Sequence, residues 1–173
     1  MYKVGDKISH PIHGAGIISD IETKEILGEE MDFYTIEIPA NKMKIFVSTD
    51  KADEVGIRKI LTKKEIDSVI KGLAVPMEKR NINWMVRTRD NEAKLATRDI
   101  NEVAMVYKEL YKLNNEKGLS STEKRMYQTA RQILVSEVSL VKSITNEKAE
   151  ALMQDSLNKS FDEDKSTFLI RNI

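Results

Sequence analysis

The first 50 residues alternate between apolar and polar positions with the period of β-strands. Turn-forming residues such as Gly5, Asp6 and Gly28 separate segments rich in β-branched and aromatic residues, which are VGDKISH, GAGIISDIE, MDFYTIEI and MKIFV. Short strands joined by tight turns predict a small barrel of five strands. In MKIFV the alternation places Phe46 on the outward face together with Lys44, so Phe46 is a candidate contact residue.

From Thr62 onward the apolar positions recur every three or four residues, which is the period of a helix. Three helix starts carry a capping box, in which a side-chain acceptor precedes a glutamate by three residues: Thr62 and Glu65, Asp99 and Glu102, Ser120 and Glu123. The stripes after Asp99 and Ser120 predict core positions: Val103, Val106, Tyr107, Leu110, Leu113, Met126, Ala130, Ile133, Leu134 and Val141.

The end of the chain gives weaker signals. Gly118 is expected to cap the helix that precedes Ser120. A last helix is expected from near Thr145 to Leu157, followed by a poorly ordered polar tail.

The change from strand to helix pattern predicts an α+β protein of two domains that fold and act separately. A small β-barrel domain covers residues 1–55, a junction covers 56–61, and an all-α domain covers 62–158, with the tail at 159–173.

The composition is that of a globular protein, with 40% hydrophobic and 32% charged residues. No apolar run approaches the roughly 20 residues that span a bilayer, and the polar start lacks the apolar core of a secretory signal. There is no cysteine, which excludes disulfides and thiolate metal sites. We therefore expect a cytoplasmic protein without membrane contact.

The net charge of zero hides an asymmetry between the two halves. Residues 1–50 hold 5 basic and 9 acidic residues, whereas residues 51–173 hold 23 and 19. The only tryptophan, Trp84, lies in the basic half near several cations: Lys79, Arg80, Arg87, Arg89, Lys94 and Arg98. A polyanion contact is one interpretation, and a tryptophan core anchor beside a solvated helix face is the other.

Motifs typical of enzymes are absent from the sequence: there is no Walker loop, Rossmann glycine pattern, nucleophile elbow or HExxH helix. His10 and His13 in HPIHG could bind a metal only with a third ligand, such as Asp20 or Glu22. A turn stiffened by Pro11 and capped by polar histidines is the simpler interpretation. We expect neither catalysis nor a cofactor.

Several segments, in the same order along the chain, closely resemble the CarD family of bacterial transcription regulators, over roughly residues 1–158. They are VGDKISHPIHGAGIISDIE, EVGIRKIL, NINW and GLSSTEKRMYQTARQILVSEVSL. The resemblance implies a Tudor-like (SH3-like) barrel, also found in the transcription-repair coupling factor, that docks on the β subunit of RNA polymerase. It also implies a helical domain that contacts promoter DNA near the −10 element and stabilises the open complex.

The resemblance places Trp84 at the upstream edge of the transcription bubble, as a wedge in the minor groove. Together with the local charge it implies a set of DNA-binding residues: Trp84, Arg87, Arg89, Arg80, Lys94, Lys124 and Arg125. Arg87, three residues after the tryptophan, is expected to share its helix face.

The polymerase contact is expected on exposed barrel strands at four residues: Lys24, Ile26, Lys44 and Phe46. Edge pairing between strands is one form that this contact could take. Phe46 stands where several family members have a basic residue, so an apolar contact would replace an ionic one. We expect a monomer.

Two other classes stay open at this level. Small SH3-like barrels that begin with a GD turn also occur in RNA- and ribosome-binding proteins. A metallohydrolase that uses His10 and His13 is the third hypothesis. Co-purification with polymerase or with ribosomes separates the first two, and bound metal would indicate the third.

Overall fold

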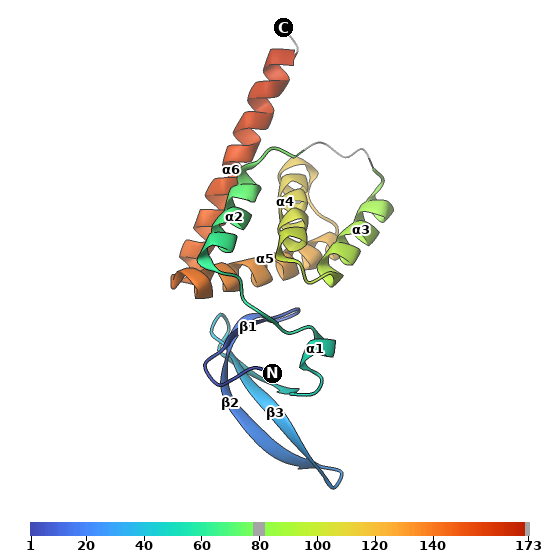
Figure 1. The fold of residues 1–173 in the computed structure, drawn as a ribbon. Coiled ribbons are helices and arrows are strands. Elements are labelled where there is room, and N and C mark those ends of the chain that lie inside the picture. Colours follow the sequence, from blue (N-terminus) through green and yellow to red (C-terminus); the bar gives the residue numbers. More distant parts are fainter. Residues whose placement is uncertain (78–81, 172–173) are drawn as a thin grey trace.

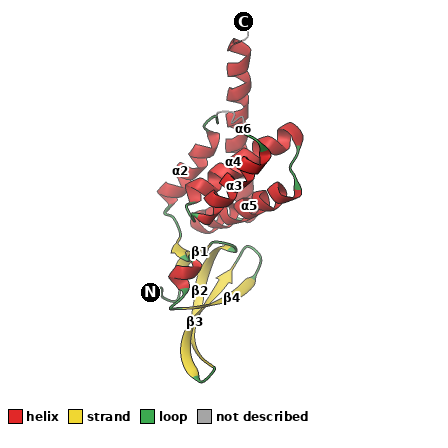
Figure 2. Ribbon diagram, turned by 90° about the vertical axis from the view of Figure 1, so that its right-hand side faces the viewer, coloured by secondary structure: helices red, strands yellow, loops and turns green. Residues whose placement is uncertain are grey.

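The computed structural model describes residues 1–77 and 82–171, with side chains as far as residue 160. A five-stranded antiparallel sheet forms the N-terminal part, and helices form the rest (Figures 1 and 2). The predicted α+β organisation is therefore confirmed.

All four predicted strand segments form strands, and a short fifth strand pairs with the first. The strands are β1 (Lys7–His10), β2 (Gly14–Ile26), β3 (Glu29–Ile38), β4 (Met43–Ser48) and β5 (Arg58–Lys59), in the order β4-β3-β2-β1-β5. The β2–β3 hairpin is longer than predicted, because the ladder continues from Glu22 opposite Phe33 to Ile26 opposite Glu29. As Figure 1 shows, this hairpin extends away from the helices.

One apolar core fills the sheet domain, because alternate residues of its strands point to the same side. Its buried members are Ile8, Ile18, Tyr34, Ile36, Ile38, Val47, Ala52 and Ile57. The last two come from the short helix α1 (Ala52–Val55) and the residues after it, which close one side of the domain.

The remaining helices are α2 (Lys63–Ala74), α3 (Trp84–Ala96), α4 (Ile100–Lys117), α5 (Ser121–Lys142) and α6 (Asn146–Arg171). The capping boxes predicted at Thr62 and Ser120 are both present, and Gly118 caps α4. Asp99 does cap α4, but it accepts from the amide of Asn101 and forms no capping box with Glu102.

A second core joins α2, α4, α5 and α6. The predicted stripes supply it, since their residues are buried, except for Leu113, which is partly buried. The predicted end of the last helix near Leu157 is wrong: α6 continues to Arg171 and projects past the other helices (Figure 1). No glycine or proline occurs in this stretch, so nothing in the local sequence interrupts the helix.

Candidate functional site

Trp84 is the first residue of α3 and lies on the surface. Asn83 caps the helix, with its Oδ1 accepting from the amide of Val86 at 3.0 Å. The Trp84 side chain is 61% exposed, and Met85 and Val86 beside it are also exposed. A core anchor would be buried, so that interpretation of Trp84 is wrong.

Arg87 is buried, although the sequence predicted an exposed position beside Trp84 for contact with DNA. It is only 8% exposed, and its Nε and Nη2 donate to Oε1 of Glu123 at 3.1 and 2.7 Å. Trp84 and Arg87 are neighbours on the helix. Arg87 lies where α3 packs against α5, whereas Trp84 lies at the exposed N-terminal end of α3. A phosphate contact by Arg87 would leave a buried carboxylate without its partner, so Arg87 acts as a structural residue.

Glu123 joins two elements through its two carboxylate oxygens. Oε2 accepts from the amide and hydroxyl of Ser120 at 2.9 and 2.8 Å, while Oε1 accepts from Arg87. Burial by itself would raise the pKa of Glu123, but the hydrogen bonds from Arg87 and Ser120 outweigh it and lower the pKa. The carboxylate thus fixes the start of α3, with Trp84, against the start of α5.

Further cations lie on α3 and α5, the two helices that this ion pair joins. Lys124 and Arg125 follow Glu123 in the first turn of α5, and both are exposed. Arg89 is exposed on α3, whereas Lys94 is half-buried about 15 Å along the helix from Trp84.

Three cations of the predicted cluster need separate mention. Lys79 and Arg80 lie outside the described residues. Arg98 lies beyond the C-terminal end of α3, and its guanidinium donates to the carbonyls of Asp53 and Glu54 at 3.3 and 3.0 Å.

The four residues predicted to contact the polymerase share one face of the sheet. The register pairs Glu22 with Phe33, Thr35 with Phe46 and Glu37 with Lys44, so alternate residues of β2, β3 and β4 point outward together. We call this the outer face, defined by four residues: Lys24, Ile26, Lys44 and Phe46.

The centre of the outer face is a cation–π contact. Lys24 Nζ lies 3.8 Å from the centroid of the Phe46 ring, and the phenylalanine is 52% exposed. The predicted outward position of Phe46 is confirmed. Lys44 pairs with Glu37 at 2.8 Å on the same face, and β4 lies at the edge of the sheet, where a further strand could pair.

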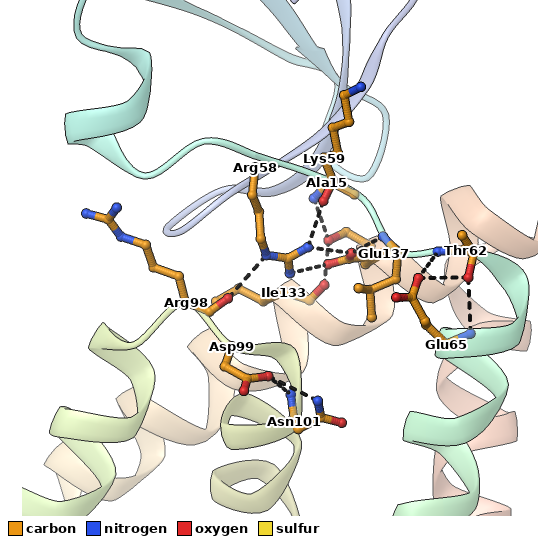
Figure 3. Close-up of polar contacts among 12 residues, drawn as sticks. Ala15, Arg58, Lys59, Thr62, Glu65, Arg98, Asp99, Asn101, Ile133 and Glu137 are labelled. Atoms are coloured by element: carbon orange, nitrogen blue, oxygen red, sulfur yellow. Dashed lines mark hydrogen bonds and ion pairs between the residues drawn. The ribbon is translucent and has the colours of Figure 1, made fainter.

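A polar contact that the sequence reasoning missed fixes the two domains together. Arg58 in β5 donates from both terminal nitrogens to the two oxygens of Glu137 in α5, each at 2.8 Å (Figure 3). The amide of Leu61 donates to the same carboxylate at 3.0 Å, and Glu137 is completely buried. We call this arrangement the domain lock, made of Arg58, Leu61 and Glu137.

Close backbone packing supports the lock on one side. The amide of Ala15 donates to Ser136 Oγ at 2.9 Å. A Cβ added at Gly14 would lie 2.2 Å from the same oxygen, and Gly14 has a φ of +82°. Only glycine fits this position, because both its conformation and its contact exclude a side chain.

His10 has a structural role in a turn. Its Nδ1 accepts from the amides of Ile12 and His13 at 3.2 and 3.3 Å, which confirms the predicted capping interpretation. Burial and then the neighbouring His13 lower the pKa of His10 to about 4. Within the described residues, no three His, Cys, Asp or Glu side chains gather as a metal site, and no helix has the length and apolar character needed to cross a membrane.

Comparison with known proteins matches both domains. A family model for the CarD-like/TRCF RID domain matches residues 2–61, and one for the CarD C-terminal domain matches residues 68–154. YdeB of Bacillus subtilis (strain 168), a candidate transcription factor by name, is 32% identical over 151 residues, which cover 87% of this chain and 99% of YdeB.

Among solved structures, the chain is similar to the 72-residue N-terminal domain of Myxococcus xanthus CarD, determined by solution NMR. The sequence identity is 29% and the TM-score 0.31, over 34% of this chain and 79% of that domain. The two family models together extend over both domains, and the YdeB alignment runs along most of the chain. The chain therefore belongs to the CarD family of transcription regulators.

Proposed function

We propose that this protein is a non-enzymatic regulator that docks on the β subunit of RNA polymerase and contacts promoter DNA at the upstream edge of the bubble, so that it stabilises the open complex. The observation that carries this proposal is the exposed Trp84 at the start of α3, held in place by a buried ion pair and accompanied by exposed cations. Membership of the CarD family supports it.

The chemistry of this surface suits the minor groove. An apolar ring inserted at a base step partly unstacks it, and this cost is offset by contacts that the deformed DNA permits. Exposed cations, here Arg89, Lys124 and Arg125, can neutralise phosphates on either side. Arg87 contributes as a positioning residue, because its bond to Glu123 fixes the helix end from which Trp84 projects.

Docking on the polymerase is assigned to the outer face. Its exposed Phe46, with Lys24 over the ring, offers an apolar contact and a cation at one point, and the free edge of β4 offers backbone groups. The RID-domain match covers this part of the chain. Docking there would bring the helical domain, as a monomer, to the DNA near the −10 element.

The test is the lifetime of open complexes formed with polymerase, promoter and protein, measured after a heparin challenge. Trp84→Ala should shorten the lifetime about 5- to 150-fold, since wedge and stacking contacts are worth about 1 to 3 kcal/mol. The variant should still bind polymerase and should melt within about 2 °C of wild type, because the ring is exposed.

A matched control is Met105→Ala, which removes an exposed apolar side chain from α4. It should leave the lifetime unchanged. An unchanged lifetime for Trp84→Ala would refute the wedge. Co-purification of the wild type with ribosomes in place of polymerase would refute the function itself and favour the RNA-binding alternative.

A further inference from the structure

The tip of the β2–β3 hairpin carries Leu27, a residue whose backbone conformation is unfavourable for leucine. Ile26 pairs with Glu29, so Leu27 and Gly28 are the two loop residues, and their φ values are +56° and +84°. Positive φ at both positions is the arrangement of a type I′ turn, in which Asn, Asp or Gly is preferred at the first position. Leucine is disfavoured there, because its Cβ crowds the backbone in the left-handed conformation.

The environment of Leu27 does not compensate for this conformation. The residue is 102% exposed, so its side chain packs against nothing in the described part of the chain. Both backbone conformation and hydration oppose a leucine at this position. A residue that is unfavourable in two independent ways points to a role outside the fold.

The surroundings of Leu27 indicate what covers it. Ile26 beside it is exposed and belongs to the outer face, which continues through Lys24 to Phe46. The hairpin end is acidic and exposed, with Glu25, Glu29 and Glu30 around the leucine. An apolar tip with an acidic rim is complementary to an apolar depression with a basic rim.

We propose that Leu27 is an anchor that enters such a basic-rimmed apolar depression on RNA polymerase, at the far end of the outer face. This inference rests on the proposed function, since it extends the docking surface along the hairpin that projects from the molecule (Figure 2). Anchors of this kind concentrate binding energy in a few side chains.

The experiment compares the affinity of full-length variants for purified RNA polymerase, together with their melting temperatures. Leu27→Asn should weaken binding at least 10-fold while its melting temperature stays level or rises by about 1 to 3 °C, because asparagine suits the turn. Leu27→Met keeps an apolar side chain and should bind within about 3-fold of wild type. Leu152→Asn, on the exposed side of α6, is the matched control and should leave the affinity unchanged.

The outcomes separate this inference from the proposed function. If wild type binds and Leu27→Asn binds equally well, the anchor is wrong while polymerase docking stands. A similar loss in Leu152→Asn would also overturn the anchor, since the effect would not be specific to the tip. If wild type itself does not bind polymerase, both proposals fall.

Discussion

The domain lock should determine both the stability of the protein and its effect on the promoter. Glu137→Ala removes a carboxylate that accepts two bonds from Arg58 and one from the amide of Leu61, all between 2.8 and 3.0 Å. The carboxylate is completely buried, so no water replaces these bonds in the intact fold.

The size of the effect follows from the exposure of the two partners. Breaking a fully buried pair costs about 3 to 5 kcal/mol, and an unsatisfied buried amide about 1 to 3 kcal/mol. The Arg58 side chain is 27% exposed and can turn partly toward water, which lowers the cost. We expect a loss of about 2 to 4 kcal/mol for Glu137→Ala, or a melting temperature lower by about 5 to 15 °C. Glu137→Gln keeps the shape and one acceptor, and should lose about 1 to 2 kcal/mol.

Two assays test this expectation: thermal and urea unfolding followed by circular dichroism, and the open-complex lifetime measured at a temperature where each variant is folded. The matched control is Asp67→Ala, which breaks the more exposed ion pair between Asp67 and Lys142 of α5 and should cost less than about 1 kcal/mol. For Glu137→Ala we expect normal polymerase affinity and a shortened lifetime. A variant that melts within 1 °C of wild type and keeps the full lifetime would refute the lock.

Three further predictions follow from the described contacts. Arg87→Ala should cost about 3 to 5 kcal/mol of stability, because it leaves the buried Glu123 carboxylate unpaired, and it should shorten the open-complex lifetime without changing its salt dependence. If Arg87→Ala instead lowered the slope of the salt dependence by about one, the amount expected for one phosphate contact, Arg87 would be a DNA-contacting residue. The free energy of unfolding should fall by about 2 to 3 kcal/mol as the pH drops from about 6.5 to about 4. The reason is that His10 has a lowered pKa in the folded state and is protonated there only at a lower pH than in the unfolded chain. Urea unfolding between pH 7 and 4 measures this loss, and the loss should be smaller in His10→Asn, which keeps an acceptor for the turn amides. Phe46→Glu and Lys24→Glu should weaken polymerase binding at least 10-fold with little change in melting temperature, since both side chains lie on the outer face; unchanged affinity in both variants would move the interface elsewhere.

The sequence predicted those features that depend on local patterns. Alternation along β4 was enough to place Phe46 on the surface, and the two capping boxes located the starts of α2 and α5. These signals are local because a strand has a period of two and a cap involves residues three positions apart. The same logic failed at α6, where a polar composition was interpreted as a tail although no residue breaks the helix.

Contacts between different helices and strands could not be predicted from local sequence patterns. The helical period places Arg87 near Trp84, but it does not say which part of α3 meets α5, so the ion pair with Glu123 could not be foreseen. Glu137 did leave a signal: it lies within the apolar stripe of α5, between Leu134 and Val141, both of which are buried. A charged residue at a core position requires a partner, and a search for that partner would have led to the junction and Arg58.

The domain lock changes how a weak DNA contact can act. A flexible tether raises the local concentration of the DNA-binding domain, but each contact must still overcome the entropy of orienting that domain. In this protein, Arg58 and Glu137 fix the helical domain on the barrel, so the orientation is set before binding. The distance from the outer face to Trp84 then becomes a property of the fold. Under the proposed function, docking through the outer face would by itself decide where the ring lies. A wedge worth only about 1 to 3 kcal/mol can be effective under these conditions, because little of that binding free energy is spent on orienting the helical domain. Loosening the lock should therefore weaken the effect on the promoter even in a protein whose polymerase contact and tryptophan are both intact.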